Sequence, residues 1–359
     1  DKLGQKNQLF GYPTLLALLF LIGLPLGPGM AHKGNPDHSV MIDTDGAIDD
    51  MRAISMLLAG NGIRVLGITC SQGSVAPATG YSKVQALLHS YHHQGIPVGA
   101  GQALNKDLPA WADFSAGISW GDSAFSAKPG EAPEAVQLLQ KITASYDEPI
   151  TLIALGSLKT YADWFRRHPG AKKGIERIIW YNAYPLEEGF NYQVHPQSYR
   201  DIIKLDIPLE VVGNNSSSLP VTPALLDTLQ HNPSVYARNM LAAHKTQPVQ
   251  QKIQNRHLQL WDDLVPLYLT APMLFKTEER KGVSYARLPQ AMPGEVVYQS
   301  VSQLLKSSLQ TNNRVFRKFP VDTALYKPPY ARILKQTRRE YGPVEWKAIS
   351  MTNEIHGHT

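Results

Sequence analysis

The sequence predicts an α/β protein with a mostly parallel sheet that carries helices on both faces. Short apolar runs alternate with amphipathic stretches from residue 38 onward, and this alternation is typical of consecutive βα units. The candidate strands are residues 38–44, 63–70, 150–156, 176–182 and 208–213. The candidate helices are residues 49–60, 77–94, 133–146, 158–168 and 196–205.

The composition is that of an ordinary globular protein. Apolar residues make up 43% and charged residues 18% of the 359 positions, enough for one large domain and an extension. The net charge of +5 is scattered in small clusters such as Arg166-Arg167, which favours solvated faces over a nucleic-acid site. The single cysteine, Cys70, excludes an intramolecular disulfide and is expected to be a small buried side chain.

The first 31 residues have the pattern of a signal segment. Lys2 and Lys6 precede the apolar run 15–24, and small residues follow up to Ala31. This pattern predicts a secretory signal peptide, or an uncleaved N-terminal anchor, over residues 1–31. The protein is therefore expected to be exported, either periplasmic or secreted, or anchored by this segment.

An acidic stretch follows the first candidate strand. Asp43, Asp45, Asp49 and Asp50 fall within eight residues, at the end of the strand 38–44 and the start of the next helix. Open α/β sheets bind ligands at the carboxyl ends of their strands, and we call this side of the sheet its carboxyl edge. Because so many carboxylates repel one another, a hard cation such as Ca²⁺ or Mg²⁺ is the natural partner.

Three other interpretations fit parts of this stretch. The acids can be turn and cap residues with no further role. An aspartyl-nucleophile phosphatase would use Mg²⁺ and a covalent phosphoaspartate on Asp43, but Ala47 stands where that motif has Thr or Val. An EF-hand loop needs a preceding helix and a Glu at its twelfth position, and a strand precedes this stretch instead.

The acidic stretch resembles the amino-terminal signature of a known family. Asp43-Thr44-Asp45 followed by Asp49-Asp50 is similar to the signature of the nucleoside hydrolases, the inosine-uridine-preferring enzymes and their relatives, although Gly46-Ala47 replaces their usual Pro-Gly. The resemblance implies a Rossmann-like fold with nucleoside hydrolase-type architecture. It also implies one bound Ca²⁺ and cleavage of the N-glycosidic bond of ribonucleosides.

Weaker parts of the family pattern follow in order. Residues 67–75 and 96–101 resemble the second and third strands, with Ser74 in place of a ribose-facing Asn. In residues 151–158, Leu155 takes the place whose backbone carbonyl binds calcium. The sequence Gly189-Phe190-Asn191 resembles the Glu-Phe-Asn motif. Asn191 matches the ribose-binding Asn, and Glu188 is expected to replace the Glu that Gly189 lacks.

The late motif contains an informative departure. Asp262 matches the Asp that binds calcium and ribose, and Trp261 stands where most members have a His that protonates the leaving base. The purine-specific branch also has Trp here. The resemblance therefore implies a purine held between aromatic rings, with Trp111 or Trp120 as the second ring. The alternative is that Trp261 only packs in the core.

Together these matches imply a complete site. Asp45, Asp50, Asp262 and the Leu155 carbonyl would bind calcium. Asp49, Asn191, Asp262 and Glu188 would bind the ribose. Asp45 is the expected general base, and Trp261 assists the leaving base. The expected protein is a purine-salvage hydrolase that forms a homo-oligomer. A catalytically impaired protein that only binds calcium and ribose is the alternative, because the usual His and Glu are replaced.

The family resemblance covers residues 38–310. Residues 311–359 are expected to form a helical extension, or the start of a truncated second domain that loosely resembles a domain of formylmethanofuran dehydrogenase. The pair His356 and His358 near its end has the spacing of metal ligands, which is weak evidence by itself.

Overall fold

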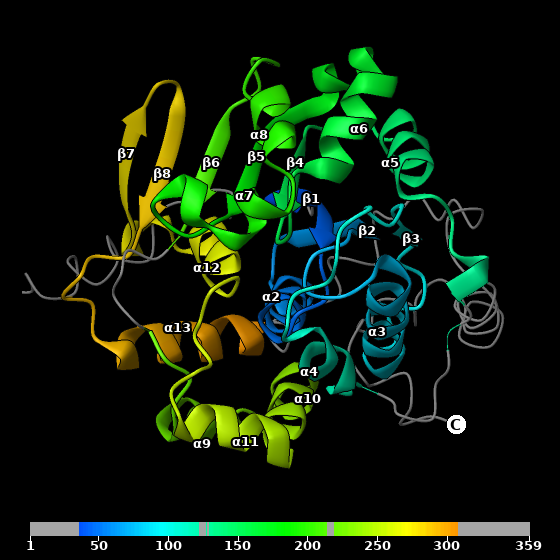
Figure 1. The fold of residues 1–359 in the computed structure, drawn as a ribbon. Helices are drawn as coiled ribbons and strands as arrows, with labels where there is room; N and C mark the ends of the chain where they lie inside the picture. The colour runs from blue at the N-terminus through cyan, green and yellow to red at the C-terminus, as the bar shows by residue number, and fades with distance from the viewer. Residues whose placement is uncertain (1–35, 122–126, 128, 214–218, 308–359) are drawn as a thin grey trace, which may run out of the picture. The chain divides into compact units, whose positions relative to one another are not determined.

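The computed structural model describes residues 36–121, 127, 129–213 and 219–307 (Figure 1). The predicted signal segment 1–31 and the predicted extension 311–359, with its two histidines, lie outside the described residues. Within the described residues, no helix combines the length and the apolar character that a membrane span needs.

The core of the protein is an eight-stranded sheet in the order β3-β2-β1-β4-β5-β6-β8-β7. The pairings are parallel except for the last, in which β7 runs antiparallel to β8. The strands are β1 (His38–Thr44), β2 (Ile63–Cys70), β3 (Val98–Ala100), β4 (Ile150–Ala154), β5 (Ile175–Tyr181), β6 (Leu209–Val212), β7 (Lys276–Arg280) and β8 (Val283–Arg287). The predicted mostly parallel sheet is confirmed, and the β7–β8 hairpin is an addition to it.

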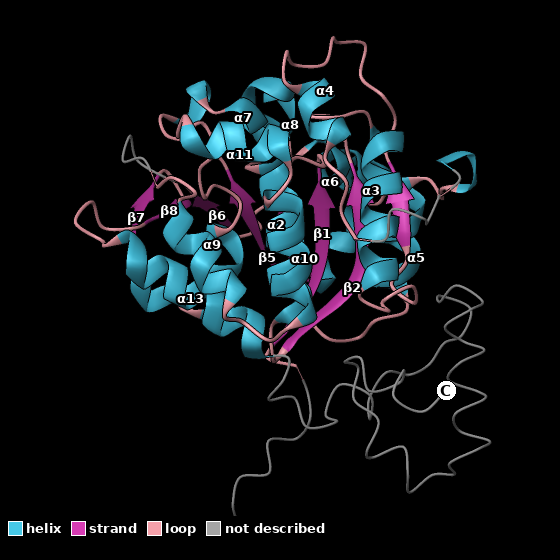
Figure 2. Ribbon diagram, turned by 90° about the horizontal axis from the view of Figure 1, so that it is seen from below, coloured by secondary structure: helices cyan, strands magenta, loops and turns pink. Residues whose placement is uncertain are grey.

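Helices cover both faces of the sheet (Figure 2). One apolar cluster lies under α5 (Ala135–Ala144), α6 (Lys159–Arg167) and α8 (Pro196–Ile202). The other lies under α2 (Ile48–Ala59), α3 (Pro77–Ser90), α9 (Pro223–Gln230), α10 (Val235–His244), α11 (Gln247–Gln254), α12 (Leu264–Thr270) and α13 (Gly294–Ser307). The short helices α4 (Ala112–Gly117) and α7 (Phe190–Val194) complete the regular structure around the site.

Strand β1 shows how the sequence produces these layers. Val40 and Ile42 belong to one apolar cluster and Met41 to the other, as the alternation of side chains along a strand requires. Cys70, at the end of β2, is fully buried and unpaired, as predicted. A strand with apolar side chains on both faces is stable only between two layers of helices.

The parallel strands place the chain segments of the site at the carboxyl edge of the sheet. The segment after β4 is held beside β1 by a hydrogen bond from the Leu155 amide to the Asp43 carbonyl (2.8 Å). Between β1 and α2 the chain turns sharply at Gly46, whose φ of +80° is costly for other residues. A Cβ atom at Gly46 would also lie 2.8 Å from the Val75 side chain. This turn leads directly into the acidic start of α2.

Candidate functional site

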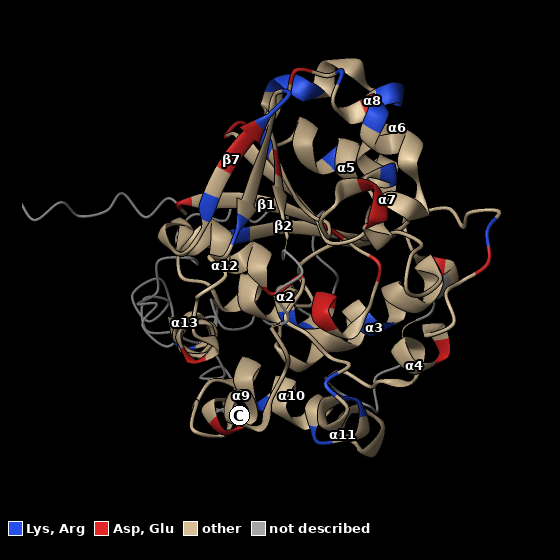
Figure 3. Cartoon of the chain, turned by 60° about the vertical axis from the view of Figure 1, so that its left-hand side comes forward, with Lys and Arg blue, Asp and Glu red and all other residues tan. Residues whose placement is uncertain are grey.

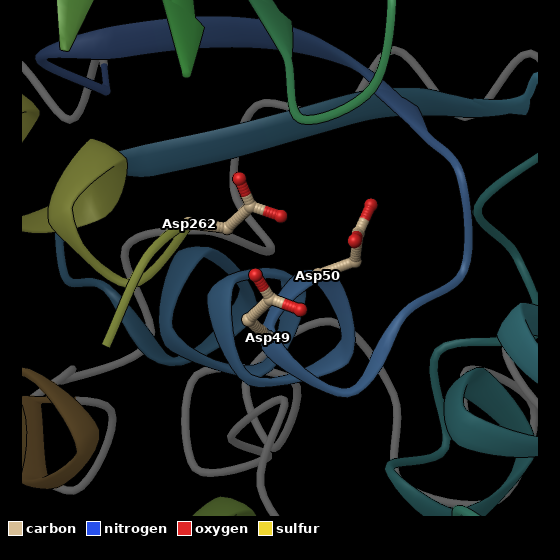
Figure 4. A group of neighbouring side chains, drawn as sticks. All are labelled: Asp49, Asp50 and Asp262. Carbon is tan, nitrogen blue, oxygen red and sulfur yellow. The ribbon is translucent and has the colours of Figure 1, made fainter. Parts of the chain in front are cut away.

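Three carboxylates from distant parts of the sequence meet at the carboxyl edge (Figure 4). Asp49 and Asp50 lie in the first turn of α2, and Asp262 lies just before α12. Figure 3 shows how the acidic and basic residues are distributed along the ribbon. One oxygen atom of each of the three carboxylates lies within 4.8 Å of the others. All three side chains are buried, so they form an enclosed acidic cluster.

Asp45 lies in the turn between β1 and α2 and is also buried. A Cβ atom at Gly73 would overlap the Asp45 carboxylate, and one at Gly156 would lie 3.0 Å from the Asp45 Cβ. A side chain at position 73 would therefore displace Asp45, and one at position 156 would require it to shift by a few tenths of an ångström. Glycine at both positions therefore leaves the space that Asp45 occupies.

The orientation of Asp50 is fixed by its neighbours. Its Oδ1 atom accepts hydrogen bonds from the Thr44 hydroxyl (2.6 Å) and from the Asp45 amide (2.9 Å). The Thr44 hydroxyl in turn accepts a bond from the Gly46 amide (3.1 Å). These bonds join the end of β1 to the start of α2 and hold Asp50 in the cluster.

The cluster is electrostatically unfavourable without a cation. Burial, followed by the charge of Asp50, raises the pKa of Asp49 to about 7 and raises the pKa of Asp45 well above its usual value. The pKa of Asp262 is also raised, by burial and by the charges of Asp50 and Asp49. A positive ion among these groups would offset both the lost hydration and the mutual repulsion.

The residues present fit a hard divalent cation. Oδ1 of Asp45 and Oδ1 of Asp262 are buried and have no hydrogen-bond partner among the described residues, which is costly for a carboxylate. Leu155 lines the same cavity, and its carbonyl accepts a hydrogen bond from the Asn191 side chain (2.6 Å). A carbonyl oxygen has a second lone pair for another partner. Such an all-oxygen set is the kind that Ca²⁺ prefers.

The cluster opens into a cavity of about 470 Å³, a size that suits a small organic ligand. Its aromatic lining consists of Trp111, Phe114, Tyr181, Phe190 and Trp261. The Trp111 and Phe190 rings meet edge to face, with centroids 5.0 Å apart. Trp261 is half-buried and packs against the large apolar cluster on its other side. The cavity thus joins carboxylates to an aromatic surface.

The structure brings most of the predicted site residues to this cavity. The residues that line it include Asp45, Asp49, Asp50, Leu155, Asn191, Trp261 and Asp262. Trp111, the first suggested second ring, also lines it, and its indole lies 3.4 Å from the Ser74 hydroxyl. Trp120 does not, because it is buried beside His244 at a centroid distance of 6.0 Å.

Glu188 lies elsewhere. Its side chain is exposed in the 3₁₀ turn Leu186–Glu188 and does not line the cavity. At the neighbouring Gly189, a Cβ atom would overlap the Asn182 side chain. Asn182 is itself fixed, donating to the Leu186 carbonyl (2.8 Å) and accepting from the Tyr192 amide (2.9 Å). Asn182 therefore fills the space that a side chain at position 189 would need.

Asp43 lies behind the cluster and serves the structure. Its two oxygens accept hydrogen bonds from the Thr69 hydroxyl (2.6 Å) and the Ser71 hydroxyl (2.7 Å). It is fully buried and does not line the cavity, and burial raises its pKa to about 7. A carboxylate held in this way cannot reach a ligand in the cavity, which removes the covalent phosphatase interpretation.

Some lining residues have no motif that would reveal them in the sequence. Lys252 comes from α11 and His257 from the loop after it. The Lys252 ammonium lies 5.4 Å from the centre of the Phe114 ring, which comes from α4. These three side chains reach the cavity because separate helices pack beside it. Their nearness in sequence to predicted site residues is the one feature that could have pointed to them. Lys252 and His257 come shortly before Trp261, and Phe114 comes shortly after Trp111.

Comparisons with known proteins agree with this architecture. Residues 40–326 match the family described as inosine-uridine preferring nucleoside hydrolase. The pyrimidine-specific ribonucleoside hydrolase RihA of Klebsiella pneumoniae (strain 342) is 28% identical over 257 residues, which are 67% of this chain and 82% of that protein. A plant nucleoside hydrolase, PpNRh1, has a similar structure with a TM-score of 0.62 at 19% identity, over 76% of this chain and 99% of that one. The purine-preferring ribonucleoside hydrolase from Gardnerella vaginalis gives a TM-score of 0.60 at 16% identity, over 75% and 99%.

Proposed function

The chain belongs to the inosine-uridine preferring nucleoside hydrolase family, and we propose that it hydrolyses the N-glycosidic bond of purine ribonucleosides with Ca²⁺ as cofactor. The products are the free base and ribose. The observation that carries this proposal is a single cavity that joins four buried carboxylates, two of them with an unpartnered oxygen, to an aromatic surface. The release of base and ribose from a panel of nucleosides tests it.

The carboxylates are suited to the sugar. Asp49, Asp262 and Oδ1 of Asn191 can accept hydrogen bonds from ribose hydroxyls, which fixes the anomeric carbon in the cavity. The Asn191 NH₂ group already donates to the Leu155 and Tyr181 carbonyls. Cleavage of a glycosidic bond passes through an oxocarbenium-like transition state. Because that state is positively charged, the surrounding carboxylates stabilise it more than they stabilise the neutral substrate.

The attacking water needs a base. When bound by Asp45, Asp50, Asp262 and the Leu155 carbonyl, Ca²⁺ would lower the pKa of a nearby water. Asp45 accepts the proton that the water loses as it attacks the anomeric carbon. The carboxylate has two oxygen atoms, so one can face the cation while the other accepts this proton. No hydrogen bond from the described residues occupies Oδ1. Glycine at positions 73 and 156 leaves the space that Asp45 occupies.

The departing base meets the other part of the cavity. Trp261 and the edge-to-face pair of Trp111 and Phe190 offer aromatic surfaces on which it can stack. Tryptophan cannot protonate the base, because its indole N–H is only a hydrogen-bond donor. His257 lines the same cavity, and a positioned imidazole is a common general acid. We assign the proton transfer to His257.

The His257→Gln variant tests this assignment with two substrates. We expect hydrolysis of inosine to fall by about 10² or more, the usual effect of losing a general acid. Hydrolysis of p-nitrophenyl riboside should stay near the wild-type rate, because p-nitrophenolate leaves without being protonated. Steady-state rates on both substrates are the measurement, with the exposed His231→Gln as the control. Equal losses on both substrates, or no loss on inosine, would refute the role.

The Trp261→Ala variant tests the stacking surface. Stacking of a base on an aromatic ring contributes about 1–3 kcal/mol, so kcat/KM for inosine should fall by a factor of roughly 5 to 150. The Ca²⁺ affinity should change little, because the Trp261 side chain supplies no oxygen ligand. The purine preference itself is tested with the wild type, by comparing inosine with uridine. If uridine is cleaved as well as inosine or better, the purine preference is wrong.

One observation favours the second candidate, a protein of the same fold that binds calcium and ribose without turnover. Glu188 is exposed away from the cavity, and position 189 has no side chain. One expected contact to the ribose is therefore missing. In this case Ca²⁺ and ribose would stabilise the protein, and no nucleoside would be cleaved.

A further inference from the structure

A fully buried ion pair lies directly beside the acidic cluster and joins its two parts. Arg52 lies in α2, separated from Asp50 only by Met51, and Asp263 directly follows Asp262 in the segment before α12. The guanidinium donates from Nε to Asp263 Oδ1 and from Nη2 to Asp263 Oδ2, both at 2.8 Å. Neither side chain is exposed. Two parallel bonds of this kind fix the orientation of both groups.

The remaining Arg52 hydrogen bonds reach the same region. Nη2 also donates to the Gln259 carbonyl (2.7 Å), and Nη1 lies 3.2 Å from Nε2 of His244. The other His244 nitrogen, Nδ1, lies 2.7 Å from the Met240 carbonyl. Burial and the Arg52 charge lower the pKa of His244 to about 3, so the ring is neutral and its Nε2 accepts from Arg52. One side chain of α2 thus contacts both α10 and the segment 259–263.

We propose that Arg52 is a positioning residue, which clamps the segment 259–263 to α2 through Asp263 and so holds Asp262 against Asp49 and Asp50. The clamp deepens the proposed function, because the acidic cluster that it assembles is the proposed cation and ribose site. The Arg52 charge also lies near Asp49 and Asp262, where it offsets part of their repulsion. It does so without entering the cavity, which it does not line.

The energetics of buried ion pairs support a geometric role. Bringing two charges out of water costs about as much as their attraction returns, and well-packed apolar residues of similar volume are often equally stable in their place. An ion pair with two parallel hydrogen bonds does, however, impose a fixed distance and angle that apolar packing does not impose. The Arg52–Asp263 pair is therefore expected to fix the position of Asp262 and to add little to the free energy of unfolding.

Replacing both partners of the ion pair separates its effect on stability from its effect on the position of Asp262. In the double variant Arg52→Met/Asp263→Leu, neither charge of the ion pair is left unpaired, so the protein should fold. Its unfolding midpoint in urea should be only modestly lower than that of the wild type, because His244 Nε2 and the Gln259 carbonyl each lose a donor. Amide hydrogen exchange of residues 258–264 should nevertheless become at least tenfold faster, and the Kd for Ca²⁺, measured by calorimetry, should rise at least tenfold. The single variant Arg52→Lys keeps the charge without the two parallel bonds, and it should show the same two changes to a smaller extent.

The partly buried pair Arg177–Glu210 is the matched control. It joins β5 to β6 away from the cavity, so Arg177→Met/Glu210→Gln should leave both quantities unchanged. Wild-type exchange of residues 258–264 in the Arg52 double variant would overturn the proposal, and Arg52→Lys decides in the same way if the double variant does not fold. If exchange is faster but the wild type binds no Ca²⁺, the clamp stands and the proposed cofactor is wrong.

Discussion

Replacing Asp45 by Asn is expected to remove nearly all hydrolysis of inosine while leaving the fold intact. Asn has almost the shape of Asp, so it fits the space beside Gly73 and Gly156, but its amide cannot accept the proton of the attacking water. Loss of a positioned general base costs a factor of about 10² to 10⁴ in rate. The turnover number of the purified variant, compared with the wild type, is the measurement.

The design has to separate the loss of the base from the loss of the cation. Asp45 is also a proposed Ca²⁺ ligand, so turnover is measured at saturating Ca²⁺. The variant Asp113→Asn, at an exposed position of α4 outside the cavity, removes one carboxylate with no expected effect. A near-wild-type turnover number for Asp45→Asn at saturating Ca²⁺ would show that Asp45 is not the base.

Calcium is expected to raise the melting temperature markedly, and Asp50→Ala is expected to abolish that rise. Asp50, Asp45 and Asp262 are buried together. The folded protein therefore offers Ca²⁺ a binding site that the unfolded chain cannot assemble. Binding to the native state alone adds about 2.7 kcal/mol at 100 times the Kd. For a domain of this size that corresponds to roughly 4 to 5 °C. Differential scanning calorimetry with Ca²⁺ and with a chelator gives the difference.

For each variant, the relevant quantity is the difference between its melting temperature with Ca²⁺ and its melting temperature with the chelator. Asp50→Ala also removes a repelling charge, so its melting temperature without cation can lie above that of the wild type. Asp113→Asn should keep the full rise with Ca²⁺. Identical melting curves of the wild type with Ca²⁺ and with chelator would show that Ca²⁺ does not bind at the site.

The sequence is most informative about the fold where both faces of a strand are buried. Continuous apolar runs bounded by polar turns predict β1 and β2 with the bounds that the structure has. The β7–β8 hairpin escapes prediction because all five residues of β7 are exposed, and Lys276–Arg280 has no apolar alternation. Its place follows from pairing with β8, which no local pattern in the sequence encodes.

The site is predictable only in part for a similar reason. Asp49 and Asp50 stand out locally, whereas their proximity to Asp262 follows from family resemblance, since the two segments are far apart in the chain. Side-chain direction is beyond such reasoning: Glu188 is adjacent in sequence to the expected position, but it points to solvent. The positions of Lys252 and His257 at the cavity depend on how α11 packs against the rest of the domain. Arg52 is a signal within the sequence, because it is the one basic residue of α2, and a charge in a helix that is mostly buried requires a partner.

The account is tested most directly by incubating the wild-type protein with inosine and Ca²⁺ and measuring the free base and the reducing sugar together. The proposed N-glycosidic hydrolysis predicts that hypoxanthine and ribose appear in equal amounts. It also predicts that both disappear with a chelator and with Asp45→Asn. If no nucleoside of a purine and pyrimidine panel releases base or ribose, although Ca²⁺ raises the melting temperature, the protein binds its ligands without cleaving them and the proposed activity is contradicted.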